Sequence, residues 1–138
     1  MRRCHWSWVA AVSLGASGVG YAHHSTAAYD YSRAMTVEGT VKEFQWTNPH
    51  MFIHLLVPDG KGQEVEWNIE CGTPNINVRH GWKKSDLNPG DHVKAEIHPM
   101  HDVGTLSGTL MILTLAGGRT LYGPGNDIVA APPGAPPQ

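Results

Sequence analysis

Polar and apolar residues alternate along several segments of the chain, and this period of two is typical of half-buried β-strands. Three segments alternate in this way. Two more apolar segments, 50–57 and 105–115, are predicted as strands because they lie between turn-forming residues. The second of these is expected to continue at 119–122. The alternating segments and their expected inward residues are 35–41 (Met35, Val37, Gly39, Val41), 64–71 (Val65, Trp67, Ile69, Cys71) and 92–98 (Val93, Ala95, Ile97).

The first strand changes parity near its end. Phe44 and Trp46 are apolar but have the opposite parity to Val41. A β-bulge or tight bend between them would restore both sets to one face. Gly39 inside the strand predicts the bend of a small barrel.

A short helix is expected after the third strand. Thr73 is a good N-cap residue, Pro74 suits the first helical position, and Gly81 marks the end. The apolar side of this helix is expected to comprise Ile76, Val78 and Trp82.

The order of elements is therefore three strands, one short helix and two strands. This order predicts an all-β domain, a five-stranded OB-like Greek-key barrel over residues 35–122, with an open five-stranded meander as the alternative. The core of this barrel is expected to include two residues of the second strand and the following twelve residues: Val37, Val41, Phe44, Trp46, Val65, Trp67, Ile69, Ile76, Val93, Ile97, Leu110 and Ile112.

The ends of the chain have a different composition. A basic start at Met1–Arg3, an uncharged run from Trp6 to Val19 and small residues up to Ala22 predict a signal peptide over residues 1–22. A retained membrane anchor is the alternative, but the run is shorter than the ~20 residues that a spanning helix needs. Residues 23–34 are interpreted as an arm, and the Pro-, Gly- and Ala-rich residues 123–138 as a disordered tail.

Cleavage after Ala22 would leave eight basic and twelve acidic residues, a net charge of −4 with neutral histidine. Nucleic-acid binding is not expected, because binding to a phosphate backbone needs several clustered Lys and Arg residues and Lys83–Lys84 is the only basic cluster. Cys71 would be the remaining cysteine, most simply a small buried hydrophobe, otherwise a reactive thiol, a dimer bridge or a soft metal ligand. The expected location is periplasmic or secreted, without stable membrane insertion.

Eight histidines among the 116 residues after position 22 suggest metal chemistry. If His23 is the processed N-terminus, its amino group and its imidazole can chelate one metal ion, and nitrogen-rich tetragonal sites favour Cu(II). His50 is the expected third ligand and His24 a further one. His54 is a candidate too, although a strand from His50 to His54 spans ~13 Å, too far for both to hold one ion.

A second histidine cluster, His98-Pro99-Met100-His101, is expected in the turn before the last long strand. Histidine with methionine suits Cu(I). For all of these histidines, simple exposure to solvent is the competing interpretation.

Other chemistry is less well supported. No nucleophile motif is present, and Glu64, Glu66 and Glu70 look like a solvated strand face, so the protein is not expected to be an enzyme unless a copper site is redox active. If Trp46 and Phe52 faced outward beside Asn48, they would form a platform for an extended ligand. The alternative function is thus a metal-free cell-envelope module that binds a glycan, a peptide or a partner protein.

The combination of motifs resembles an uncharacterised family of small exported bacterial proteins. The resemblance covers roughly residues 23–122 and implies an exported single-domain protein without an assigned activity. Cys71 and Met100 depart from the family pattern. The resemblance rests on four motifs: His23-His24-Ser25, Thr47-Asn48-Pro49-His50, Gly81-Trp82 and Leu87-Asn88-Pro89-Gly90-Asp91.

Overall fold

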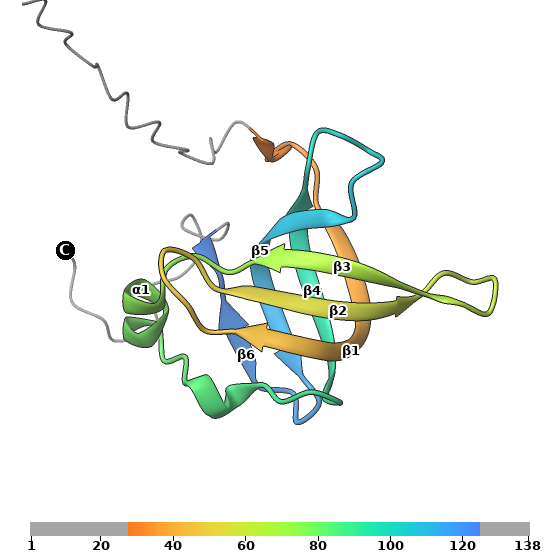
Figure 1. Cartoon of the computed structure of the whole chain (residues 1–138). Helices are drawn as coiled ribbons and strands as arrows, with labels where there is room; N and C mark the ends of the chain where they lie inside the picture. Colours follow the sequence, from red (N-terminus) through yellow and green to blue (C-terminus); the bar gives the residue numbers. More distant parts are fainter. Residues whose placement is uncertain (1–27, 125–138) are drawn as a thin grey trace, which may run out of the picture.

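A single sheet closes on itself in the computed structural model, which describes residues 28–124. Its order is β3-β2-β1-β4-β5-β6, and a parallel pairing of residues 68–70 in β3 with residues 107–109 in β5 closes the barrel (Figure 1). The strands are β1 Met35–Gln45, β2 Phe52–Pro58, β3 Glu64–Glu70, β4 His92–Pro99, β5 Ser107–Leu115 and β6 Thr120–Tyr122.

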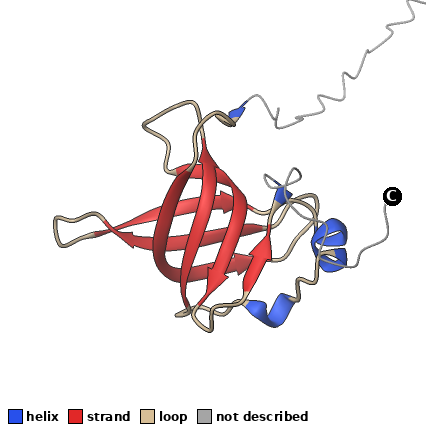
Figure 2. Cartoon of the chain, turned by 180° about the vertical axis from the view of Figure 1, so that it is seen from behind, coloured by secondary structure: helices blue, strands red, loops and turns tan. Residues whose placement is uncertain are grey.

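The segment between β3 and β4 contains the helix α1, Pro74–Arg79, and a 3-10 turn, Lys84–Asp86. Both lie at one end of the barrel, as Figure 2 shows from behind. The predicted OB-like barrel with the order βββαββ is confirmed, with the short β6 added after the fifth strand.

The change of parity in the first strand is a β-bulge, as predicted. Val41 pairs with Leu55 and Glu43 pairs with His54, so Lys42 is the extra residue. Gly39 lies where β1 passes so close to β2 that a Cβ atom there would lie 2.3 Å from the carbonyl oxygen of Leu56. The bulge and the glycine together let a single strand curve around the barrel.

The helix begins as predicted, but its packing differs from the prediction. The Thr73 side chain accepts a hydrogen bond from the amide of Ile76, and Pro74 occupies the first turn. Ile76 and Val78, expected to be buried, are about half exposed, and Asn77 is buried instead. Asn77 donates its side-chain amide to the carbonyl of Cys71, so a polar contact fixes the orientation of this two-turn helix.

The core lies inside the barrel and continues under α1. Ile112, expected in the core, is half-buried, and Leu113 takes its place. The reason is a second bulge, because Ile97 pairs with Leu110 while Glu96 pairs with Ile112, which leaves Met111 as an extra residue. The buried hydrophobic residues are Val37, Val41, Met51, Ile53, Leu55, Ile69, Cys71, Trp82, Leu87, Val93, Ala95, Ile97, Leu110, Leu113 and Leu121.

Other expected core residues lie at its edge. Phe44, Trp46 and Trp67 are half-buried and pack against the core, and Val65 is half-buried. Cys71 is fully buried as a free thiol, which agrees with the simplest of the interpretations.

Several predictions fall on residues that are not described. The signal peptide at 1–22, the start of the arm and nearly all of the 123–138 tail lie outside residues 28–124. Within that range, no helix has both the length and the apolar character needed to span a bilayer.

Candidate functional site

The outer face of β2 and β3 carries two pairs of imidazole and carboxylate groups. Ile53, Leu55 and Ile69 point into the core, so the residues between them point outward. The antiparallel register places His54 opposite Asn68, and Phe52 opposite Glu70. Directly opposed residues project from the same face of a sheet, so these four side chains share the outer face.

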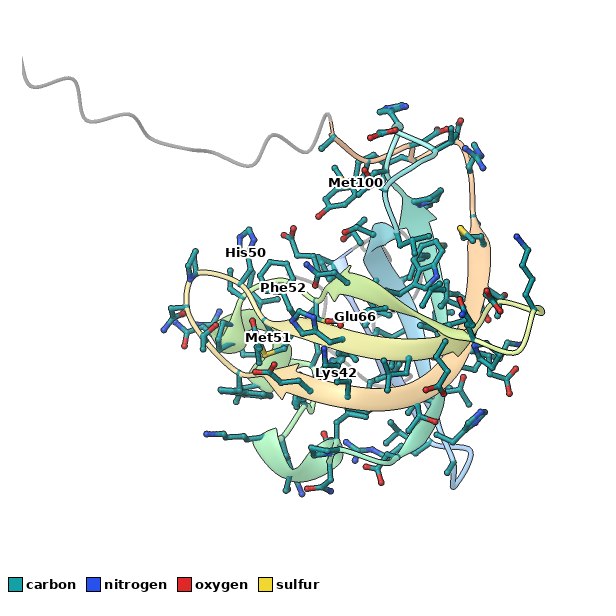
Figure 3. The ribbon with its side chains drawn as sticks, turned by 45° about the vertical axis from the view of Figure 1, so that its right-hand side comes forward. Lys42, His50, Met51, Phe52, Glu66 and Met100 are labelled. Carbon is teal, nitrogen blue, oxygen red and sulfur yellow. The ribbon has the colours of Figure 1, made fainter. Side chains whose placement is uncertain are left out.

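The first pair is His50 with Glu70, at the start of β2 and the end of β3. Nδ1 of His50 lies 2.6 Å from Oε1 of Glu70. The hydroxyl of Tyr29 donates to Oε2 of the same carboxylate over 2.5 Å. The Glu70 side chain is 12% exposed, so a nearly buried carboxylate joins a histidine to the N-terminal arm. Figure 3 shows His50 and Phe52 at this end of β2.

Tyr29 links the arm to the barrel through its backbone as well as its side chain. It forms an isolated bridge with Met100, and the neighbouring amide of Asp30 donates to the carbonyl of Pro99. Burial raises the pKa of Tyr29 well above its usual range, with smaller contributions from the hydrogen bond to Glu70 and from the negative charge of that carboxylate. The phenol is therefore held neutral at physiological pH.

The second pair is His54 with Glu66, four residues further along each segment on the same face. Nδ1 of His54 lies 2.9 Å from Oε1 of Glu66, and Nζ of Lys42 donates to Oε2 over 2.5 Å. The hydrogen bond from Lys42 is the main cause that lowers the pKa of Glu66. The labels in Figure 3 place Lys42, Glu66 and Phe52 on this side of the barrel.

The His98-Pro99-Met100-His101 cluster was expected in a turn, but its first two residues belong to a strand. His98 belongs to β4 and is buried, with Nδ1 2.7 Å from the carbonyl oxygen of Arg33 and its ring against Tyr31. Met100 and His101 follow β4, and their amides donate to the carbonyls of Ser107 and Ala28. His98 thus contributes to the wall that holds the arm, while His101 is exposed.

The three residues of the expected ligand platform lie in different surroundings. Trp46 packs against the core and makes an edge contact with Phe44, with ring centroids 5.6 Å apart. Asn48 is exposed in the loop between β1 and β2, where its peptide bond to Pro49 is cis. Phe52 is half-buried on the outer face.

His23 and His24 lie outside the described residues. Within residues 28–124, no group of three or more His, Cys, Asp or Glu side chains is arranged to hold a metal ion. His50 is a described ligand candidate that lies beside the arm, since Glu70 joins it to Tyr29.

Sequence reasoning missed the carboxylates of this site. Glu66 and Glu70 were expected to form a solvated face, but each is bonded to a histidine and Glu70 is nearly buried. The signal was present, because His50 and His54 lie just before and within β2, and the next strand alternates glutamate with other residues. Only the register of β2 against β3 shows which glutamate meets which histidine.

Comparison with known proteins identifies the family of the chain. The model of a family described as a family of unknown function, DUF6152, matches residues 10–109. No curated protein matches the chain. Two solved structures of a mitochondrial single-stranded DNA binding protein from S. cerevisiae, Rim1, are similar, each with a TM-score of 0.46. Form 1 is 21% identical and covers 61% of this chain and 92% of its own, and form 2 is 20% identical and covers 66% and 97%.

Proposed function

Because the chain belongs to this family of unknown function, we propose a function from its own residues: it is an exported protein that binds a transition metal, copper first. The ligands we propose are the amino group and imidazole of His23, the imidazole of His50 and, as a further donor, His24. The observation that carries the proposal is the bridge that Glu70 makes between His50 and Tyr29.

Glu70 gives His50 the tautomer that a metal ligand needs. A carboxylate only accepts hydrogen bonds, so Nδ1 of His50 carries the hydrogen that points to Glu70. In the neutral ring Nε2 then keeps its lone pair. A carboxylate that holds the second nitrogen of a ligating histidine orients the ring and raises its basicity. His50 is therefore prepared to bind a metal through Nε2.

Tyr29 brings the arm to the same carboxylate. Position 23 is six residues before Tyr29, and an extended chain covers at most about 3.3–3.6 Å per residue. The backbone of residue 23 is thus restricted to within about 20–22 Å of the backbone of Tyr29, whose phenol contacts Glu70. This tether raises the effective concentration of His23 at His50, without a bond between them.

The proposed location follows from the predicted signal peptide at residues 1–22. Export would place the protein in the periplasm or outside the cell, where removal of the leader frees the amino group of His23. An amino group and two imidazoles make a nitrogen-rich set, which favours Cu(II) among the first-row divalent metals.

The test is a Cu(II) titration of the chain that begins at His23, beside a chain with one added N-terminal residue. We expect the added residue to weaken copper binding strongly, because the amino group of His23 becomes an amide. Electron paramagnetic resonance of the Cu(II) form should lose nitrogen couplings at the same time. Equal affinity of the two chains would refute the amino-terminal site.

The role of Glu70 is tested separately. Glu70→Gln should weaken copper binding about 10–100-fold, the usual effect of removing the partner of a ligating histidine. Glu66→Gln is the matched control, because Glu66 makes the same kind of contact with Nδ1 of His54, four residues further along the face. If the two variants bind copper equally well, His50 is not the third ligand.

A further inference from the structure

β3 has a paired neighbour along the whole of one edge and along part of the other. On one side it pairs with β2 from Glu64 to Glu70. On the other side its pairing with β5 covers residues 68–70. Among the residues that the structure describes, no strand pairs with residues 64–67 on that second side. We refer to this side of residues 64–67 as the open edge of β3.

The backbone groups of alternate residues point to the open edge. The amide of Asn68 donates to the carbonyl oxygen of Leu106, on the β5 side of the strand. The hydroxyl of Ser107 donates to the carbonyl oxygen of Asn68 from the same side. Backbone direction alternates along a strand, so the N–H and C=O groups of Glu64 and Glu66 point to that side too. Within residues 28–124 no other backbone group bonds to them there.

The inward side chains beside the open edge are incompletely covered. Trp67 lies opposite Leu55, which is fully buried, so Trp67 projects to the inside of the barrel. Val65 lies two residues earlier and projects the same way. Both are nevertheless only half-buried, and Leu106, just before β5, is 39% exposed. An apolar surface therefore continues from the inside of β3 to the open edge.

The loop before β5 bonds to itself and does not continue the pairing with β3. The amide of Thr105 donates to the carbonyl oxygen of Asp102, and the amide of Ser107 donates to that of Thr105. The carboxylate of Asp102 also accepts from the amide of Gly104 and the hydroxyl of Thr105. Residues 101–106 are exposed. The place of a further strand beside the open edge is therefore left to an added segment.

The outer face of the open edge is acidic. Glu64 is exposed and has no side-chain partner in the described part of the chain. Glu66 pairs with Lys42, but both side chains are well exposed, and such an ion pair contributes little. A second copy of β3 would place glutamate against glutamate, which is destabilising between opposed strand residues. The complementary partner is therefore a basic strand of another protein.

We propose that the open edge binds an extended peptide segment of a partner protein in which basic and apolar residues alternate. The segment adds a strand to β3 and bonds to the backbone groups of Glu64 and Glu66. Its apolar side chains cover Val65 and Trp67, and its lysines or arginines lie beside the two glutamates. None of the proposed copper ligands belongs to this surface, so the proposal does not rest on the copper site.

The test is an NMR titration of the metal-free, 15N-labelled chain that begins at His23 with the peptide acetyl-Lys-Val-Lys-Val-Lys-amide. The amide of Glu66 is expected to shift and its hydrogen exchange to slow, because it gains an acceptor. The amide of Trp67 is the internal reference, since it already points to β2. The charge control is the same peptide with glutamate in place of lysine. The backbone control is the fully N-methylated peptide, which has no N–H donor.

Glu64→Lys tests the edge itself. This variant should bind the lysine peptide about two- to tenfold more weakly, because an attractive cross-strand pair becomes repulsive. Glu38→Lys is the matched control and should leave binding nearly unchanged, because Glu38 is an exposed residue of β1, which has paired strands on both sides. Equal binding of the N-methylated peptide would overturn strand addition in favour of charge attraction alone. Equal binding of the glutamate peptide, or unchanged exchange of Glu66 at millimolar peptide, would overturn the proposal as a whole.

Discussion

At the scale of single residues, the site depends on Glu70. Its two oxygens hold His50 on one side and Tyr29 on the other, and its side chain is nearly buried. A buried carboxylate needs such partners, because an unpaired charge away from water is very unfavourable. One residue therefore fixes both the proposed metal ligand and the position of the arm.

The first prediction concerns Tyr29. Its folded-state pKa is raised, mainly by burial, above the usual value of about 10. The stability that the neutral phenol contributes is fully present below pH 10. It is lost as the pH rises above 10, because the unfolded chain ionises first. In an alkaline titration followed at 295 nm, Tyr29→Phe should remove the tyrosine that ionises last, and an unchanged late phase would contradict this assignment.

At the scale of elements, β1 is a curved strand that pairs with a different neighbour along each of its halves. It pairs with β4 over residues 35–40 and with β2 over residues 40–45. Gly39 allows the close approach to β2 and the bulge at Lys42 restores the inward parity of Phe44. Lys42, the extra residue of the same bulge, reaches Oε2 of Glu66 on β3 with its Nζ, so the irregularity that curves β1 also determines an ion pair on the outer face.

The second prediction tests this curvature. Gly39→Ala should lower the free energy of unfolding by about 1–3 kcal/mol or more, because the added Cβ would lie 2.3 Å from the Leu56 carbonyl oxygen and β2 must move. Urea unfolding measures the change. Gly117→Ala is the control, since a Cβ there meets nothing within 4 Å. An equal effect of the two substitutions would show that the close approach is not what matters.

At the scale of the whole molecule, the barrel end under α1 is closed by Trp82. The indole is buried, and its Nε1 donates to the carbonyl oxygen of Tyr122 over 2.9 Å. This bond joins the segment after α1 to β6, 40 residues later in the chain. Phe44 also packs on Trp82, with ring centroids 6.1 Å apart, so the same side chain reaches β1.

The third prediction follows from this closure. Trp82→Phe should reduce the stability of the whole domain by about 2–4 kcal/mol, because it removes the donor to the part-buried carbonyl of Tyr122 and leaves a smaller ring in the core. The expected unfolding is still a single cooperative transition, with a lower midpoint. Tyr122→Phe is the control, because only the backbone of Tyr122 accepts the bond. Equal midpoints for the two variants would refute the role of Trp82.

The local features of the chain could be predicted from the sequence. Alternation of polar and apolar residues predicted three of the strands, the flanking turn residues predicted two more, and the parity of Phe44 predicted the bulge in β1. Thr73 and Pro74 predicted the start of the helix, and the order of elements predicted the barrel. These features depend on neighbours a few residues apart, so the physical signals that specify them are contained in short stretches of sequence.

Tertiary structure decided which distant side chains meet. The pairing of β2 with β3 brings the side chain of Glu70 to His50 and that of Glu66 to His54, so two residues of an apparently solvated face become partners of histidines. A second bulge exchanges Ile112 for Leu113, and Asn77 orients the helix in place of Ile76. A shift of one residue in register would turn each side chain to the other face, and no stretch of sequence fixes that choice alone, because it depends on how all the strands close around one core.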